Sequence, residues 1–415
     1  MPVASSIPAT RAGLVSALLV ALAFALGFAE FVLIGITPDV AEGIGAPLVA
    51  VGDLVGYYAL ACAAATPIIS LASARADRLK LTAALLVVFN AGNLLTLFAN
   101  DYALLVASRL MPAVTSGTLL AVAMTYVPDI VGNTRAPRVI GLLLAGFSVS
   151  SVVGVPVGTL LADAFGWKAA YACVLALGLV VSAALLPALP RQGAPATPAA
   201  ERTSPALRSQ LRILGDGRVL ANTAMILLGA AGTYVFHTYL TPVLEGPVGL
   251  DSVGASAVLL LVGAACVGSN LLSGWIAERF GLRALPVTFA LHAVALALLA
   301  VTIPSGLPVI ANVLAVALLM YVMNSTVQML YQNVARTDYP AAVTFSASLH
   351  PMSFNAGIAL GSLVGGAVVS TGGLAATGPV GALFALGACA LAVALVKMTA
   401  TTHEKRVASP AIEIR

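Results

Sequence analysis

Twelve long apolar runs constrain this chain more than any other feature of its sequence. A helix needs about 20 consecutive apolar residues to cross the hydrocarbon core of a bilayer. Runs of this length lie at residues 12–37, 48–72, 81–99, 103–127, 138–162, 169–189, 218–243, 253–277, 284–303, 307–333, 341–370 and 375–397. Only 9% of the 415 residues are charged, whereas a typical soluble protein has about 25%. The sequence therefore predicts an all-α polytopic membrane protein with twelve transmembrane helices.

Lysine and arginine are distributed very unevenly between the two sides of this twelve-span arrangement. Eighteen of them fall on one side, Lys168 alone falls on the other, and Arg109 lies within a span. Cytoplasmic loops are enriched in Lys and Arg, so both termini are predicted to be cytoplasmic. The first span is too long for the apolar core of a signal peptide and is expected to be retained. We expect a multi-pass protein of a bacterial-type inner membrane. We expect the lipid bilayer to be its partner, and we do not expect it to bind nucleic acid.

The longest hydrophilic stretch divides the chain into two halves. The predicted regions are a six-helix bundle at 1–189, a cytoplasmic linker with a short amphipathic helix at 190–217, a second six-helix bundle at 218–397, and a cytoplasmic tail at 398–415. Two ladders of small residues at four-residue spacing, 207 residues apart, are Gly146, Ser150, Gly154 and Gly158, and Ser353, Gly357, Gly361 and Gly365. Small residues at this spacing let helix backbones approach closely in a bilayer. The matched ladders favour duplication into two parallel six-helix repeats.

The motifs that are typical of several classes of protein are absent from this sequence. The sequence has no Gly-x-x-x-x-Gly-Lys-Ser/Thr phosphate loop and no Gly-x-Ser-x-Gly elbow, and its four histidines lack metal-ligand spacing. The four cysteines are far apart and lie inside apolar runs, as small buried residues do. We therefore expect no cofactor and no metal, and we do not expect an enzyme. A membrane-embedded enzyme or a sensor stays open as an alternative.

Two charged residues stand out inside the predicted spans, Glu30 in the first and Arg109 in the fourth. A charge at the centre of a membrane helix costs about 2.5–3.5 kcal/mol on insertion scales, so such residues usually have a function and a partner. At a rise of about 1.5 Å per residue, both lie roughly 9–10 Å from the outer edge. Desolvation favours the protonated form of a carboxyl group, and a nearby cation favours the ionised form. A cavity that opens and closes around this pair would couple protons to transport; a static salt bridge is the alternative.

Polar side chains in other spans are candidates for proton coupling and substrate binding. His237 lies at a depth similar to that of Glu30, and the ordinary pKa of histidine, about 6.5, suits proton coupling; a structural, hydrogen-bonded histidine is equally consistent. The candidates for substrate binding are Tyr58, Tyr234, Tyr239, Asn324, Gln328 and Asn355. Uncharged amides and phenols suit sugars, nucleosides or amphipathic drugs, and they equally suit hydrogen bonds between helices.

Short motifs recur along the chain in a characteristic order. The loop Gly274-Trp-Ile-Ala-Glu278-Arg279-Phe-Gly281-Leu-Arg283 follows the eighth span, and a related loop without the glycines, Ser73-Ala-Arg-Ala-Asp77-Arg78-Leu-Lys80, follows the second. The other motifs are Ser108-Arg109-Leu-Met-Pro-Ala-Val-Thr-Ser-Gly117, Gly154-Val-Pro156-Val-Gly158, Phe236-His237-Thr238-Tyr239-Leu-Thr-Pro242 and Gly268-Ser-Asn270. In this order and spacing the whole chain resembles the major facilitator superfamily. It is most similar to the twelve-span drug and sugar efflux branch with its arabinose-efflux-permease-like proteins.

This resemblance implies a fold, a mechanism and roles for particular residues. Arg109 matches the arginine associated with proton coupling, and the antiporter motif falls on Gly154, Pro156 and Gly158. The gating-loop residues are Asp77, Arg78, Glu278, Arg279 and Arg283. We expect a secondary transporter that exports a neutral or amphipathic small molecule in exchange for protons, by alternating access and as a monomer. An uptake symporter or uniporter of the same fold is the alternative.

Overall fold

Helices form nearly all of the computed structural model, which describes residues 9–72, 77–132, 136–190, 207–305 and 308–408. The first half contains α1 (Ala9–Ile44), α2 (Leu48–Ala72), α3 (Arg78–Leu97), α4 (Tyr102–Val131), α5 (Ala136–Val149), the π-helical turn η1 (Ser150–Gly154), α6 (Val155–Phe165) and α7 (Trp167–Ala188). The second contains α8 (Leu207–Leu211), η2 (Arg212–Gly215), α9 (Gly217–His237), α10 (Leu240–Glu245), α11 (Ser252–Phe280), η3 (Gly281–Ala284), α12 (Leu285–Thr302), α13 (Pro308–Met320), α14 (Asn324–Asp338), η4 (Pro340–Ala342), α15 (Val343–Gly372), η5 (Leu374–Ala376) and α16 (Thr377–Ala408).

Eleven stretches of the described residues are long and apolar enough to cross a membrane. The longest, Ser252–Thr302, contains both α11 and α12, so each of the twelve predicted spans has a counterpart. No strand occurs in the described ranges. The predicted all-α polytopic membrane fold is confirmed.

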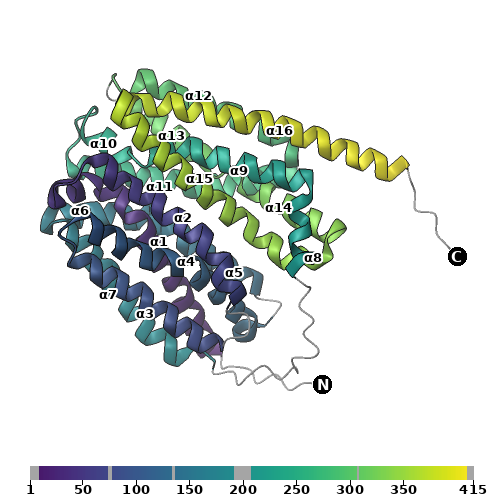
Figure 1. The fold of residues 1–415 in the computed structure, drawn as a ribbon, viewed down its shortest axis with the longest axis horizontal. Coiled ribbons are helices and arrows are strands. Elements are labelled where there is room, and N and C mark those ends of the chain that lie inside the picture. The colour runs from purple at the N-terminus through teal and green to yellow at the C-terminus, as the bar shows by residue number, and fades with distance from the viewer. Residues whose placement is uncertain (1–8, 73–76, 133–135, 191–206, 306–307, 409–415) are drawn as a thin grey trace.

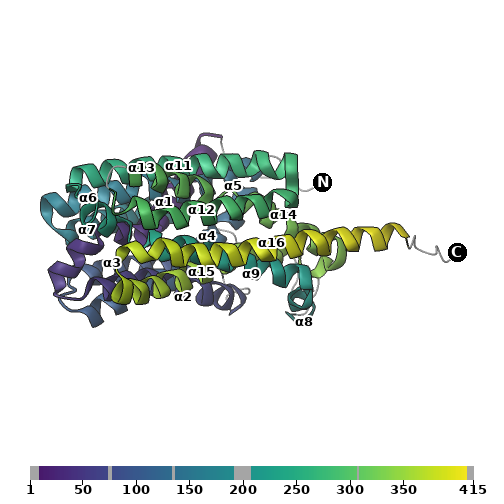
Figure 2. The same cartoon turned by 90° about the horizontal axis from the view of Figure 1, so that it is seen from above.

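The helices gather into two groups, α1–α7 and α9–α16 (Figure 1). The end of the molecule at which α1 begins and α8 lies is called the terminal face here. The opposite end, which carries the α1–α2, α3–α4 and α15–α16 links, is called the distal face. α16 runs along the length of the molecule and extends past α8 at the terminal face (Figure 2). The predicted tail at 398–415 therefore starts inside a helix, and its last seven residues lie outside the described ranges.

The glycine ladders are places where helices of one half approach each other closely. A Cβ atom added to Gly154 would lie 2.6 Å from the Phe28 ring on α1, and one added to Gly357 would lie 2.6 Å from Ala230 Cβ on α9. The ladder of the fifth span thus packs on the first span, and that of the eleventh span packs on the seventh. The same packing in both halves supports the duplication inferred from the sequence.

Three of the predicted spans are not continuous helices. In α1 the backbone leaves helical geometry at Ile36, with φ −119° and ψ 17°, just before Pro38. The seventh span breaks at residues 238–239 and the tenth at 321–323. Proline has no N–H to donate to the carbonyl four residues earlier, which explains a bend near Pro38 and near Pro242. The predicted helices at 218–243 and 307–333 are therefore each two helices.

The break in the tenth span is held by side chains of α11. The backbone N–H groups of Tyr321 and Ser325 donate to the hydroxyl oxygens of Ser269 and Ser273, at 2.9 and 2.8 Å. Irregular backbone inside a membrane protein requires such partners, because no water is available in the hydrocarbon core. Ser269 belongs to the Gly268-Ser-Asn270 motif, so this motif helps to stabilise the break in the tenth span.

A short helix lies in the described part of the linker. α8 spans Leu207–Leu211 and continues as a 3-10 turn to Gly215, and the preceding linker residues lie outside the described ranges. The side chain of Ile213 in the 3-10 turn is fully buried, whereas that of Leu211 at the end of α8 is 39% exposed.

Candidate functional site

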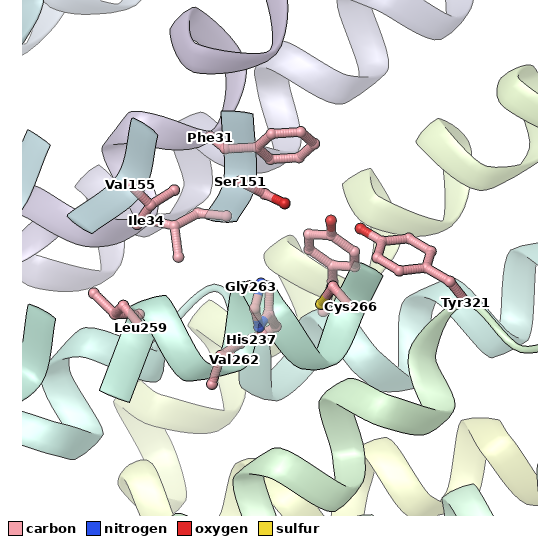
Figure 3. A pocket seen from close by; sticks show the side chains of 11 residues that line it. Phe31, Ile34, Ser151, Val155, His237, Leu259, Val262, Gly263, Cys266 and Tyr321 are labelled. Atoms are coloured by element: carbon pink, nitrogen blue, oxygen red, sulfur yellow. The ribbon is translucent and has the colours of Figure 1, made fainter. Parts of the chain in front are cut away.

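A small pocket lies between the two helix groups. Phe31, Ile34, Ser151 and Val155 line it from the first half, and Tyr234, His237, Leu259, Val262, Gly263, Cys266 and Tyr321 line it from the second (Figure 3). The cavity among these side chains measures only about 20 Å³, which is room for about one water molecule. Both halves thus contribute to one narrow site.

The lining of this pocket is apolar and aromatic, with a few polar groups. Tyr234 packs edge-on against His237, with ring centroids 5.4 Å apart, and against Phe354 at 6.2 Å. The polar atoms come from Ser151, His237 and two tyrosines, and no lining side chain carries a permanent charge. In the part of the chain that is described, no three His, Cys, Asp or Glu residues gather as they would around a metal ion. This arrangement suits a solute with an apolar body and one or two hydrogen-bonding groups.

Glu30 lies on α1, one residue before Phe31 of the pocket, and its side chain is partly exposed. Among the described residues no ion pair or hydrogen bond involves its carboxylate. It interacts electrostatically with Arg109 and with phenols of both halves, Tyr58, Tyr234 and Tyr321. Glu30 is therefore an acid without a direct partner among the described residues, in electrostatic range of Arg109 and one residue from the pocket-lining Phe31.

Arg109 lies close to Glu30 but binds the backbone beside it. The guanidinium is 2% exposed and donates from Nη2 to the carbonyl oxygen of Ala29. Nη1 donates to Asn93 Oδ1 at 3.4 Å, which is a long hydrogen bond. The expected proximity of the first and fourth spans is present, whereas a salt bridge from Arg109 to Glu30 is absent among the described residues.

The predicted substrate residues are spread over three places. Tyr234 lines the pocket, as does His237, which was predicted for proton coupling. Tyr58 is buried with its ring against the Arg109 guanidinium, and Tyr239 is fully buried near the distal face. The three amides lie elsewhere: Asn324 donates to Asn270 Oδ1 at 3.2 Å, Asn355 donates to the Pro351 carbonyl at 3.0 Å, and Gln328 is partly exposed on α14.

Several pocket residues were not singled out by sequence reasoning. Phe31 and Cys266 look like ordinary apolar residues of a span, and Ser151 is one of many small residues near the glycine ladder. Tyr321 faces the pocket because the tenth span breaks directly after Met320. Of the pocket residues, Tyr234 and His237 are the ones that the sequence had singled out, because polar side chains are rare in spans.

The antiporter-like motif forms part of the pocket wall. Ser150–Gly154 form a π-helical turn, and Pro156 follows directly in α6. Such turns occur frequently at functional sites. Gly263 of α11 packs against Val152 in this turn, so the turn that leads into the motif contacts the second half of the molecule. Gly158 packs on Val32 of α1: a Cβ atom added to Gly158 would lie 2.5 Å from Val32 Cγ2.

The two copies of the gating loop differ in their contacts. Asp77 caps α3 by accepting hydrogen bonds from the N–H groups of Leu79 and Lys80, and Arg78 pairs with Asp129 of α4 at 2.6 Å. Their second-half counterparts Glu278, Arg279 and Arg283 are exposed. The copy with fewer matching residues is thus the one that ties two helices together.

Near the distal face the two halves are joined by a seam, here defined by Ile34, Gly52 and Asp53 of the first half and Tyr239, Thr241 and Gly366 of the second. Thr241 Oγ1 donates to the carbonyl oxygen of Ile34 at 2.8 Å. This carbonyl is the one that Pro38, four residues later, leaves without a helical partner. A Cβ added to Gly366 would lie 2.5 Å from Asp53 Oδ1, so the seam is tightly packed.

Replacing Thr241 with Val is expected to loosen this seam. A hydrogen bond of this kind contributes about 1 kcal/mol, so amide hydrogen exchange around residues 34–44 and 240–251 should speed up by about fivefold. The matched control is Thr37→Val, since Thr37 Oγ1 donates only to Leu33 of its own helix, at 2.6 Å. Equal exchange in both variants, followed by mass spectrometry, would show that the bond does not hold the seam.

Comparison with known proteins connects this geometry with transport. The family model described as the Major Facilitator Superfamily matches residues 19–349. The inner membrane transport protein YdhP of Escherichia coli (strain K12) is 28% identical over 391 residues, 93% of this chain and 95% of that protein. A chloramphenicol resistance protein of Streptomyces lividans is 29% identical over 382 residues, 91% of this chain and 94% of that protein.

A solved structure shares the fold. It is that of a bacterial homologue of the human lysosomal transporter Spinster, in an inward-facing and unoccupied conformation, with a TM-score of 0.74 and 15% identity. The similarity covers 94% of this chain and 98% of that one. The relatives and the fold are those of transporters rather than enzymes, as the sequence predicted.

Proposed function

The chain belongs to the Major Facilitator Superfamily, and on that premise we propose that it exports a neutral or amphipathic small molecule in exchange for protons. It is a multi-pass membrane transporter, and the family match confirms the resemblance noted from its motifs. A relative named as a chloramphenicol resistance protein supports the proposal that this chain exports a small molecule.

One observation carries the proposal: Glu30, a membrane-embedded carboxylate with no ion-pair partner among the described residues, lies next to the pocket. A salt bridge stabilises the ionised form of a carboxylate, so a paired carboxylate binds a proton weakly. A carboxylate without an ion-pair partner in a low dielectric binds a proton more tightly, because its ionised form is not stabilised. Protonation and solute binding therefore affect the same region. Arg109, at the Ala29 carbonyl, and His237, in the pocket wall, complete the groups proposed for proton coupling.

Alternating access follows from the position of the pocket between two halves. We assign the distal face to the extracytoplasmic side and the terminal face to the cytoplasm, following the distribution of Lys and Arg. The packed seam then belongs to a conformation that is closed to the outside. Rocking of one half against the other would open the seam and expose Glu30 to external protons. Asp77, Arg78, Glu278, Arg279 and Arg283 would limit this movement at the cytoplasmic side, in a transporter that works as a monomer.

The test is a flux measurement in proteoliposomes that contain the purified protein. An imposed pH gradient should drive movement of a radiolabelled solute against the proton flow, starting with chloramphenicol, a lipophilic cation, a nucleoside and arabinose. Movement in the same direction as protons would favour the symporter instead. If no solute of the panel responds to the gradient, while ionophore controls confirm tight vesicles, the proposed antiport is wrong.

A further inference from the structure

Arg109 has an unusual environment for a cation inside a membrane protein. Of its three guanidinium nitrogens, one binds a backbone carbonyl, one makes a long bond to Asn93, and Nε has no partner. None of the ion pairs among the described residues includes it. A buried charge of this kind is normally paired, because its removal from water is costly. Something other than a carboxylate must stabilise it.

Two tyrosine rings lie against this guanidinium, one from α2 and one from α7. The Arg109 Cζ atom lies 5.0 Å from the centre of the Tyr58 ring on α2 and 4.9 Å from that of the Tyr171 ring on α7. Both rings are buried, at 3% and 0% exposure. A cation above an aromatic face within about 6 Å is attracted by the ring quadrupole, most strongly away from water.

We propose that Tyr58 and Tyr171 are positioning residues that cage Arg109 against α1, so that its charge acts on Glu30 without pairing with it. The inference rests on the proposed proton coupling at Glu30. The cage fixes the guanidinium at the Ala29 carbonyl and leaves the neighbouring carboxylate free to take up and release a proton. Without the two rings, the guanidinium of Arg109 would turn to the Glu30 carboxylate, with which it can form charge-assisted hydrogen bonds.

The two tyrosines are held in different ways, and this makes the proposal testable. Ser116 donates its hydroxyl hydrogen to the Pro112 carbonyl at 2.7 Å, so Tyr58 donates to Ser116 Oγ, at 2.9 Å. Tyr171 is held by its ring, which packs edge-on against Trp167 at 6.0 Å and 87°. Its hydroxyl is buried and has no partner. The Tyr171 ring therefore has the positioning task, and its hydroxyl does not.

Other titratable groups around the site are few. Near Glu30 they are Tyr58 and Cys62 on α2, Tyr234 and the pocket-wall residue His237 on α9, and Tyr321 between α13 and α14. Near Arg109, α3 contributes the neutral Asn93 and α7 contributes Tyr171. The tyrosines and the thiol stay neutral over the range in which carboxylates ionise, and His237 is the same in every variant compared. A difference between variants in that range therefore reports on Glu30 and Arg109.

The experiment follows the carboxylic acid band of Glu30 by infrared difference spectroscopy of the full-length protein in nanodiscs, as a function of pH. The band is identified by its absence in Glu30→Gln. In Tyr171→Leu we expect its midpoint to move to lower pH by about one unit or more, because a new contact with a cation favours the ionised carboxylate by that amount. Tyr171→Phe keeps the aromatic face and should leave the midpoint unchanged.

Two further variants complete the test. Tyr171→Met fills a similar volume without an aromatic face and replaces the Leu variant if that protein does not fold. Tyr126→Leu removes the ring from the other arginine–tyrosine pair of this half, Arg78 and Tyr126 at 4.9 Å, and should not move the band. The inference is overturned if the Leu or Met variant titrates like the wild type, or if the Phe variant shifts as much as they do. Failure of the proposed antiport is seen separately, because the band titrates whether or not a solute is transported.

Discussion

Replacing Glu30 with Gln is expected to abolish proton-driven transport while leaving solute binding and solute exchange in place. Gln has nearly the same shape as protonated Glu, so the pocket beside it should keep its form. It cannot release a proton, and the transporter would lose the step that couples the gradient to the change of conformation. Flux driven by a pH gradient should fall to the rate of protein-free liposomes, whereas exchange of labelled for unlabelled solute without a gradient should continue.

The control for this variant lies on the same helix. Glu42 is exposed at the end of α1, and Glu42→Gln should transport like the wild type. Unchanged gradient-driven flux in Glu30→Gln would remove Glu30 from the proton pathway and leave His237 as the residue of the pocket wall still proposed for proton coupling. Loss of both flux and exchange would instead indicate that Glu30 binds the solute itself.

Replacing Gly361 with Ala is expected to destabilise the second half of the protein. The added Cβ would lie 2.9 Å from Ala231 Cα and 3.0 Å from Ala231 C on α9, which is backbone that cannot move alone. Overpacking of this kind costs about 1–3 kcal/mol. The midpoint of thermal unfolding in detergent should fall by several degrees, and transport should decrease in proportion to the amount of folded protein.

The control is a glycine with free space around it. A Cβ on Gly141 of α5 would meet nothing within 4 Å, and Ala is a better helix former than Gly. Gly141→Ala should therefore unfold at the same temperature as the wild type or slightly higher. A Gly361→Ala protein as stable as this control would mean that α9 and α15 can move apart without cost, contrary to the packing described.

The sequence predicted the helices well because each span has a strong local cause. About 20 apolar residues and the side on which Lys and Arg fall determine where a span begins and ends. The breaks were missed because their causes are not local. The tenth span breaks where hydroxyls of Ser269 and Ser273 replace its helical hydrogen bonds, and these serines lie 52 residues earlier in the chain.

Only part of the candidate site was predicted, because some of its residues are brought together by contacts between distant parts of the chain. Glu30, Arg109 and His237 stand out because polar residues are rare in spans, and the structure places all three near the pocket or beside α1. Tyr171 was not noticed, since a tyrosine in an apolar span has many ordinary roles. Its relation to Arg109 appears only when α4 and α7 are seen together, as does the seam bond between Thr241 and Ile34.

The broken tenth span gives the pocket an adjustable wall. Its two halves are tied to α11 by hydroxyl oxygens, and a serine hydroxyl can follow a moving N–H by rotating about one bond. A regular helix would have to break a backbone hydrogen bond to make the same movement. Tyr321, which lies at the break in the tenth span, can therefore present its ring or its hydroxyl to the pocket without exposing backbone to lipid. In the proposed transporter, this part of the pocket wall would follow the outline of the solute without the loss of a backbone hydrogen bond.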